Sequence, residues 1–172
     1  MVFKKQLLVG LGIGPALLVI FFVWRYSSAL FAFVSTPADD PASRLSFAAH
    51  WLLIPGLTLV AGVVGAGRRG FYRGAIEGTR WPENRSLEIN LRYNINTVEQ
   101  TLLVLIAWPG LSLALPQEHL TLVPAAAFLF GFGRLTFWLG YQLHPLARAF
   151  GMVLTAVPTV IAYVWLAANT LG

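Results

Sequence analysis

Residues 89–115 read INLRYNINTVEQTLLVLIAWPGLSLAL, and their only charged side chains, Arg92 and Glu99, lie in the first half. At a rise of about 1.5 Å per residue, a helix of this length crosses a hydrocarbon core of about 30 Å. A charged side chain inside such a span costs about 3 kcal/mol on insertion scales, so it faces a protein interior and suggests a function. The stretch therefore predicts a membrane helix that carries a polar site.

The rest of the chain has the same apolar character. Of its 172 residues, 57% are hydrophobic and 11% are charged, and the mean hydropathy is +0.69. Soluble domains carry roughly a quarter charged residues, so an ordinary soluble enzyme and a disordered chain are both excluded. The net charge is +5, but the basic residues lie between apolar runs, as in membrane proteins, and we expect no nucleic-acid partner. The chain has no Cys, which excludes thiolate metal sites and a protein thiol nucleophile.

Long apolar segments separated by short polar breaks predict an all-α integral membrane protein with five spans. The stretch after the first segment lacks a clear small-residue cleavage pattern, which favours a retained span over a signal peptide. The expected spans are residues 6–24, 45–67, 89–115, 120–143 and 149–172.

The basic residues predict the orientation of the spans. If every segment crosses, Arg25 and Arg44 lie on one side, and the other side holds Lys4, Lys5, the loop arginines Arg68, Arg69, Arg73, Arg80 and Arg85, and Arg148. The positive-inside rule then makes the N-terminus cytoplasmic in a multi-pass protein of the cell (inner) membrane. Two sets of small residues, Gly10/Gly14 and Gly62/Gly65/Gly67, have the spacing of close helix packing, but we favour the interpretation that all of them are ordinary glycines of membrane helices.

Polar side chains form stripes on two consecutive spans. Arg92, Asn96 and Glu99 have the spacing i, i+4, i+7 and share one helical face, with Gln100 beside Glu99. On the next span, Arg134, Tyr141 and Arg148 recur every seven residues. Pro145 lies before Arg148, and we expect the helix to bend or end there.

Glu99 and Arg134 lie at the same depth on antiparallel neighbours, each about 13 Å inside the cytoplasmic end of its helix. We therefore expect them to pair or to share a ligand, since either charge alone would be strongly destabilising. The alternative is a buried ion pair that only fixes helix register, while Arg92 and Arg148 extend to lipid headgroups. His50, His119 and His144 are too scattered in sequence to predict a metal site.

These motifs resemble the membrane-associated proteins in eicosanoid and glutathione metabolism, the MAPEG family. Residues 92–99, RYNINTVE, are similar to its R-x-x-x-N-x-x-E signature, and residues 134–148 resemble its R-x-x-Y-x-x-x-Y-x6-R pattern. The resemblance extends over residues 47–170 and is closest to the mattrin-like branch. It implies a homotrimer in which residues 45–172 form the four-helix membrane domain and residues 1–34 add an N-terminal transmembrane helix.

The resemblance also implies a ligand, glutathione, bound between subunits at the cytoplasmic ends of the helices. By position, Arg92, Asn96, Glu99 and Gln100 would bind its charged and amide groups, and Arg134 and Tyr141 would line the opposite wall. One of the loop arginines Arg68, Arg69 or Arg73 could supplement the positive charge that binds its carboxylates. Arg148 matches the family's catalytic arginine, which stabilises the thiolate by lowering the thiol pKa from about 8.5. The implied partners are a second copy of the chain, membrane lipids, glutathione and a lipophilic small molecule.

Two functional interpretations follow. The first is a membrane-bound glutathione transferase or peroxidase that acts on lipophilic electrophiles. The second is a non-catalytic, mattrin-like membrane interaction or lipid-binding protein with a repurposed pocket. Phe137 favours the second, because several catalytic branches place Tyr at that position, and His144-Pro145 alters the approach to Arg148. A transporter is disfavoured because the spans show no paired repeat.

Overall fold

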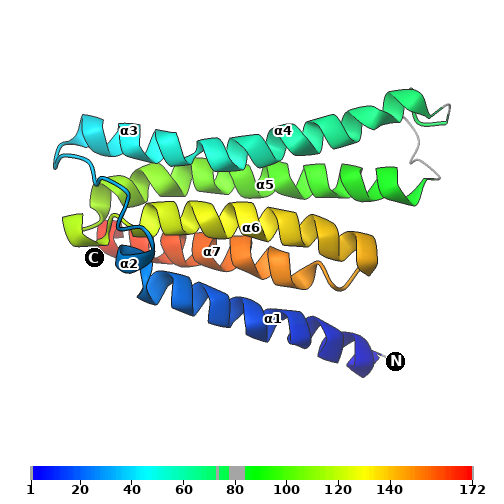
Figure 1. Ribbon diagram of the computed structural model, residues 1–172, viewed down its shortest axis with the longest axis horizontal. Helices are drawn as coiled ribbons and strands as arrows, with labels where there is room; N and C mark the ends of the chain where they lie inside the picture. Colours follow the sequence, from blue (N-terminus) through cyan, green and yellow to red (C-terminus); the bar gives the residue numbers. More distant parts are fainter. Residues whose placement is uncertain (1, 73, 78–83, 172) are drawn as a thin grey trace.

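The computed structural model describes residues 2–72, 74–77 and 84–171, with the backbone alone for 2–8 and 171, and this part of the chain is helical without a strand (Figure 1). Its longest helices lie side by side and alternate in direction. The elements are α1 (Val2–Arg25), α2 (Ser27–Leu30), α3 (Pro41–Trp51), α4 (Leu53–Gly67), η1 (Arg68–Phe71), α5 (Arg85–Ala114), η2 (Gln117–His119), α6 (Leu122–Leu143) and α7 (Ala149–Leu171).

Among the described residues, four helices are long and apolar enough to cross a membrane. They are Pro41–Phe71, Arg85–Ala114, Gln117–Leu143 and Ala149–Thr170, and they confirm the last four predicted apolar segments to within a few residues. For α1 (Val2–Arg25), an apolar helix of Val9–Arg25 is found within the part whose side chains are described, and a membrane crossing by the first segment stays a prediction.

The bundle has two chemically different ends. α1, α5 and α7 begin at the end where α4 and α6 finish, on the side of the N-terminus in Figure 1. We call this the arginine-rich end, because its described basic residues are Arg68, Arg69, Arg85, Arg92 and Arg148. Arg25 and Arg44 lie at the opposite end, as the alternation of spans predicts. The side of the membrane that each end faces stays a prediction.

α1 is packed against the bundle and is not a detached anchor. It lies along α7 and α6. Its buried side chains pack with small and branched residues of these helices in one apolar cluster. That cluster comprises Ala16, Ile20, Val23, Ala125, Leu129 and Leu154.

Close contact between α6 and α7 depends on glycines. A Cβ atom on Gly151 would overlap the backbone of α6 at Phe137 N and Gly133 O, and one on Gly133 would lie 3.0 Å from Gly151 O. A side chain at Gly151 would push the helices apart, so the bundle needs glycine there.

The glycines that the sequence pattern singles out have mixed roles. Gly62 and Gly65 pack against Asn94 and Asn90 of α5, so the favoured interpretation as ordinary glycines is wrong for this pair. It holds for Gly10, Gly14 and Gly67, because a Cβ atom added to any of them would meet no neighbour within 4 Å. These three face away from the packed side of their helices.

Gly151→Ala tests the α6–α7 contact. We expect it to lower the stability of the bundle by about 1–3 kcal/mol, since the added methyl group overlaps backbone atoms that cannot rotate away. Gly14→Ala is the matched control, because a methyl group there meets open space. Unfolding of both variants in mixed detergent micelles provides the measurement, and equal stability of Gly151→Ala and wild type would contradict the packing argument.

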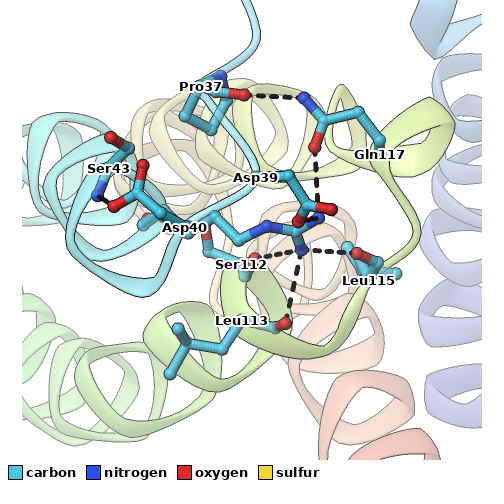
Figure 2. A network of polar contacts seen from close by, with 9 residues as sticks. Pro37, Asp39, Asp40, Ser43, Ser112, Leu113, Leu115 and Gln117 are labelled. Atoms are coloured by element: carbon cyan, nitrogen blue, oxygen red, sulfur yellow. Dashed lines mark hydrogen bonds and ion pairs between the residues drawn. The ribbon is translucent and has the colours of Figure 1, made fainter.

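Arg44 ties the start of α3 to the end of α5. Figure 2 labels its partners Asp39, Ser112, Leu113, Leu115 and Gln117. Its Nη1 donates to the backbone oxygens of Ser112 (3.0 Å), Leu113 (3.3 Å) and Leu115 (2.6 Å). Its Nη2 donates to Gln117 Oε1 at 3.1 Å and pairs with Asp39 Oδ1 at 2.8 Å. The last carbonyls of a helix lack intrahelical donors and carry partial negative charge, so a buried guanidinium satisfies them well.

The neighbouring Asp40 caps α3. Its Oδ1 accepts a 2.9 Å hydrogen bond from Ser43 N, and hydrogen bonds from Ser43 hold the pKa of the Asp40 carboxyl below its ordinary value. A lowered pKa in the folded state means that this cap stabilises the fold above the ordinary aspartate pKa. The stabilisation is lost as the pH falls through the folded-state pKa.

Arg44→Ala should destabilise the protein by about 3 kcal/mol, because it removes charge-assisted hydrogen bonds and leaves the α5 carbonyls without donors. Arg25→Ala is the control: Arg25 lies at the same end and contacts the Tyr26 ring at 5.5 Å. Chemical denaturation in detergent measures the free energy of unfolding of the two variants. A loss of stability no larger for Arg44→Ala than for Arg25→Ala would refute the capping role.

Candidate functional site

An outer polar cluster gathers three predicted site residues at the arginine-rich end. Arg92 Nη1 donates to the Tyr141 hydroxyl at 3.3 Å, and Arg92 Nη2 pairs with Glu88 Oε1 at 2.7 Å. The Arg148 guanidinium lies over the Tyr141 ring at 4.6 Å. α6 ends at Leu143, as Pro145 predicts, and Arg148 extends from the connection to α7 yet still reaches Tyr141.

An inner cluster lies deeper between α5 and α6. Arg134 has no exposed surface, and its Nη1 donates to Asn96 Oδ1 at 2.7 Å. Asn96 Nδ2 in turn donates to Glu99 Oε2 at 3.3 Å. The guanidinium also lies 4.4 Å from the centre of the Phe137 ring. The stripe on α5 and the start of the stripe on α6 therefore meet, as their depths predict.

The prediction that Glu99 pairs directly with Arg134 is wrong. No ion pair joins these two residues in the described part of the chain, and Asn96 bridges them. Arg134 is buried between the helices, whereas Glu99 is exposed on the outer surface of α5. A ligand shared by Glu99 and Arg134 stays a prediction.

Arg134 keeps two buried donor atoms without a hydrogen-bond partner in the described structure, Nε and Nη2. Buried polar groups of folded proteins are nearly always satisfied, and an unsatisfied charged donor is especially costly. An arginine in this state is well suited to bind an acceptor supplied from outside the chain, such as a carboxylate.

A pocket of about 410 Å³ lies beside Arg134, between α4, α5 and α6. Arg68 adds a second guanidinium to its wall, while Asn90 is held in place by Trp138 Nε1 at 2.9 Å and Gly65 O at 3.3 Å. The lining is Ala61, Gly62, Val64, Gly65, Arg68, Asn90, Tyr93, Arg134, Leu135 and Trp138. Two cationic side chains in a largely apolar wall favour an anionic ligand with a non-polar part.

The remaining residues that the sequence predicts for the site are not joined to the two polar clusters by a side-chain hydrogen bond or ion pair in the described part of the chain. Gln100 is buried on α5 with its Oε1 unpartnered, and no hydrogen bond joins it to another predicted site residue in the described structure. Arg69 donates to Ala75 O at 3.1 Å within its own loop, and Arg73 lies outside the described residues. The described His, Asp and Glu side chains form no group of three that would hold a metal.

Sequence reasoning missed Glu88 and the pocket-lining residue Asn90. Glu88 falls in the first turn of α5, one residue before the predicted span. Its i, i+4 spacing to Arg92 was an available signal. Asn90 has no such local signal, because its place in the pocket beside Arg134 depends on the packing of α4 against α5 and α6. Of the three loop arginines that the sequence offers as supplementary charge, Arg68 lines this pocket.

Comparison with known proteins finds similarity to Transmembrane protein 79, also called mattrin. The protein from Mus musculus is 35% identical over 81 residues, which cover 47% of this chain and 21% of the relative. The protein from Bos taurus is 28% identical over 139 residues, covering 78% of this chain and 35% of the relative. The chain thus spans about a third or less of the length of these relatives.

No family model and no solved structure matches the chain. The transmembrane relatives and the four long apolar helices together identify a multi-pass membrane protein.

A double-mutant cycle tests the inner cluster. Asn96→Ala removes the acceptor of Arg134 Nη1, and we expect it to destabilise the protein by about 1.5–3 kcal/mol. Adding Arg134→Met should recover part of this loss, because an apolar side chain needs no acceptor. Unfolding in detergent measures the free energy of unfolding of each single variant and of the double variant. Asn169→Ala, at the exposed end of α7, is the control. Strictly additive effects of the two substitutions would count against the bridge.

Proposed function

We propose that this chain is a MAPEG-type membrane protein that forms a homotrimer and binds glutathione at a cytoplasm-facing site between subunits. The observation that carries the proposal is Arg134, a fully buried arginine with two unpartnered donor atoms beside a pocket of about 410 Å³. The proposal is supported further by the chemistry of the ligand, the exposed face of α5 and the position of Arg148.

The charges of glutathione match those of the two clusters. The tripeptide carries two carboxylates, one ammonium group and two amides, so it needs cationic, anionic and amide partners together. Arg92 and Arg134 supply the cations, Glu99 supplies an anion, and Asn96 supplies an amide between them. Carboxylates bound by guanidinium groups form strong charge-assisted hydrogen bonds.

The surroundings of Glu99 support a trimer. Its neighbours on the surface of α5 are large apolar side chains with exposed fractions of 53% for Ile95, 57% for Leu102 and 68% for Ile106. A carboxylate on a lipid-facing surface is costly, and such groups normally face protein or a water-filled cavity. A neighbouring subunit over this face would enclose Glu99 and complete the intersubunit site.

Arg148 is the residue proposed for catalysis. Its guanidinium is held against the Tyr141 ring by a cation–π contact and remains exposed, so it can approach a bound thiol. An adjacent positive charge favours the thiolate, which is the reactive form. In conjugation, the thiolate sulfur forms a bond to an electrophilic carbon of a lipophilic substrate, and the leaving group departs with its electron pair.

The second candidate is a non-catalytic, mattrin-like membrane protein with the same fold. The similarity to Transmembrane protein 79, also called mattrin, supports the mattrin-like part of this candidate. Phe137 favours it as well: its ring lies over the Arg134 guanidinium and offers no hydrogen-bond donor to a ligand.

Calorimetry of glutathione binding in detergent separates the two candidates. We expect saturable binding by the wild type and its loss in Arg92→Ala. Arg148→Ala should retain binding but lose the ultraviolet absorbance of the bound thiolate, because the charge that lowers the thiol pKa is absent.

Arg25→Ala, at the opposite end of the bundle, is the matched control and should bind like the wild type. Native mass spectrometry of each variant reports whether the trimer persists, so that loss of a ligand contact is distinguished from loss of assembly. A wild-type protein that shows no binding at millimolar glutathione would exclude the transferase and leave the second candidate.

A further inference from the structure

A second pocket lies at the opposite end of the bundle from the arginine clusters, between α1, α5, α6 and α7. Its volume is about 150 Å³, and its wall contains three tryptophans, Trp24 of α1, Trp108 of α5 and Trp165 of α7. The remaining lining residues are aliphatic or proline, so no charged side chain lines it.

Helix bundles are closely packed, so a pocket of this size between four helices is unusual. Protein interiors contain few voids larger than a water molecule, and atoms lining a void lose dispersion contacts. Water does not fill it favourably, because a buried water needs two to four polar partners and the wall is apolar. The pocket is therefore suited to an apolar occupant.

The position of the pocket determines which apolar molecule is available. Trp108 lies six residues before the end of α5, which places it about 9 Å inside the helix end and within the apolar part of the span. The pocket is only partly enclosed, and Trp24 and Trp165 are half-buried, whereas Trp108 is 2% exposed and lies at the bottom. An opening on the side of a membrane bundle at this depth faces lipid hydrocarbon.

We propose that this pocket binds the hydrocarbon chain of a membrane lipid, which enters from the bilayer and lies against Trp108. The size fits a short stretch of acyl chain: an engineered cavity of about 150 Å³ with an apolar lining stays dry and binds benzene. The site requires the first helix, since Trp24 of α1 closes it on one side. It is independent of the proposed glutathione site.

Two small residues allow the pocket to be filled from within. Ala126 of α6 and Ala162 of α7 are both buried and line it. Ala126→Leu and Ala162→Leu each place aliphatic carbons where the acyl chain would lie. Ala168→Leu makes the same change at an exposed position of α7 and is the matched control. Ala162→Val is a milder variant in case the larger side chain impairs folding.

The test uses the full chain in phosphatidylcholine nanodiscs with a phosphatidylcholine that carries a diazirine on its acyl chain. After illumination, mass spectrometry locates the lipid adducts by fragment sequencing. Label on Trp108 reports the pocket, because this side chain is almost inaccessible from outside, and label on the exposed Ile106 of the same helix reports ordinary lipid contact.

We expect adducts on Trp108 in the wild type and in Ala168→Leu, and their loss in the two filled variants, while Ile106 is labelled in all. Wild-type protein labelled on Ile106 but not on Trp108 would overturn the proposal, whether the pocket is empty or covered by another protein segment. Equal Trp108 labelling in the filled variants would overturn it as well.

Discussion

A buried guanidinium is the constraint on which the centre of this bundle depends. Arg134 is fully buried. Its guanidinium donates one hydrogen bond, to Asn96, and lies over the rings of Phe137 and Tyr93. Removing a cation from water costs several kcal/mol even after relaxation, and one neutral acceptor and two rings offset only part of that cost. The two unpartnered nitrogens therefore make this position one that a bound anion would stabilise.

The charged side chains at the two ends of α5 have different surroundings. At its C-terminal end, both Nη atoms of Arg44 are bound by backbone oxygens, Gln117 or Asp39, and only its Nε lacks a hydrogen-bond partner among the described residues. Along its N-terminal half, Arg92 and Glu99 are exposed, and Asn96 connects Glu99 to the buried Arg134 of α6. Both Nη atoms of Arg44 make contacts within the fold, whereas Arg134 uses Nη1 alone in the described structure, so its remaining donors mark a place where a ligand can bind.

Much of this architecture could be predicted from local pattern. Residues 45–67, 89–115, 120–143 and 149–172 are apolar runs long enough to span a membrane, and the bundle has helices at each of them. Helical rise and antiparallel order predicted that the polar stripes of α5 and α6 meet at the depth of Glu99 and Arg134, but not that Asn96 bridges these two residues. The orientation of the spans and the identity of the ligand stay predictions, because both depend on molecules outside the chain.

Other features depend on packing that a sequence pattern does not contain. Gly151 permits the tightest approach of α7 to α6, but nothing in its neighbourhood distinguishes it from Gly14, which faces open space. Arg44 has the sequence context of a loop charge, and its partners lie about 70 residues away in the chain. The role of each residue is set by which side of its helix the neighbouring helices cover.

The arrangement of the two pockets separates polar from apolar chemistry along the bundle. The pocket beside Arg134 has two guanidinium groups and the amide of Asn90 in its wall, and the pocket beside Trp108 has neither kind of group. α5 and α6 contribute to both, so a water-soluble anion and a lipid chain would contact the same pair of helices at different depths. α1 contributes only to the apolar pocket, through Trp24. Its packing against α7 therefore adds a lipid-facing site to the bundle and leaves the polar site to the other helices.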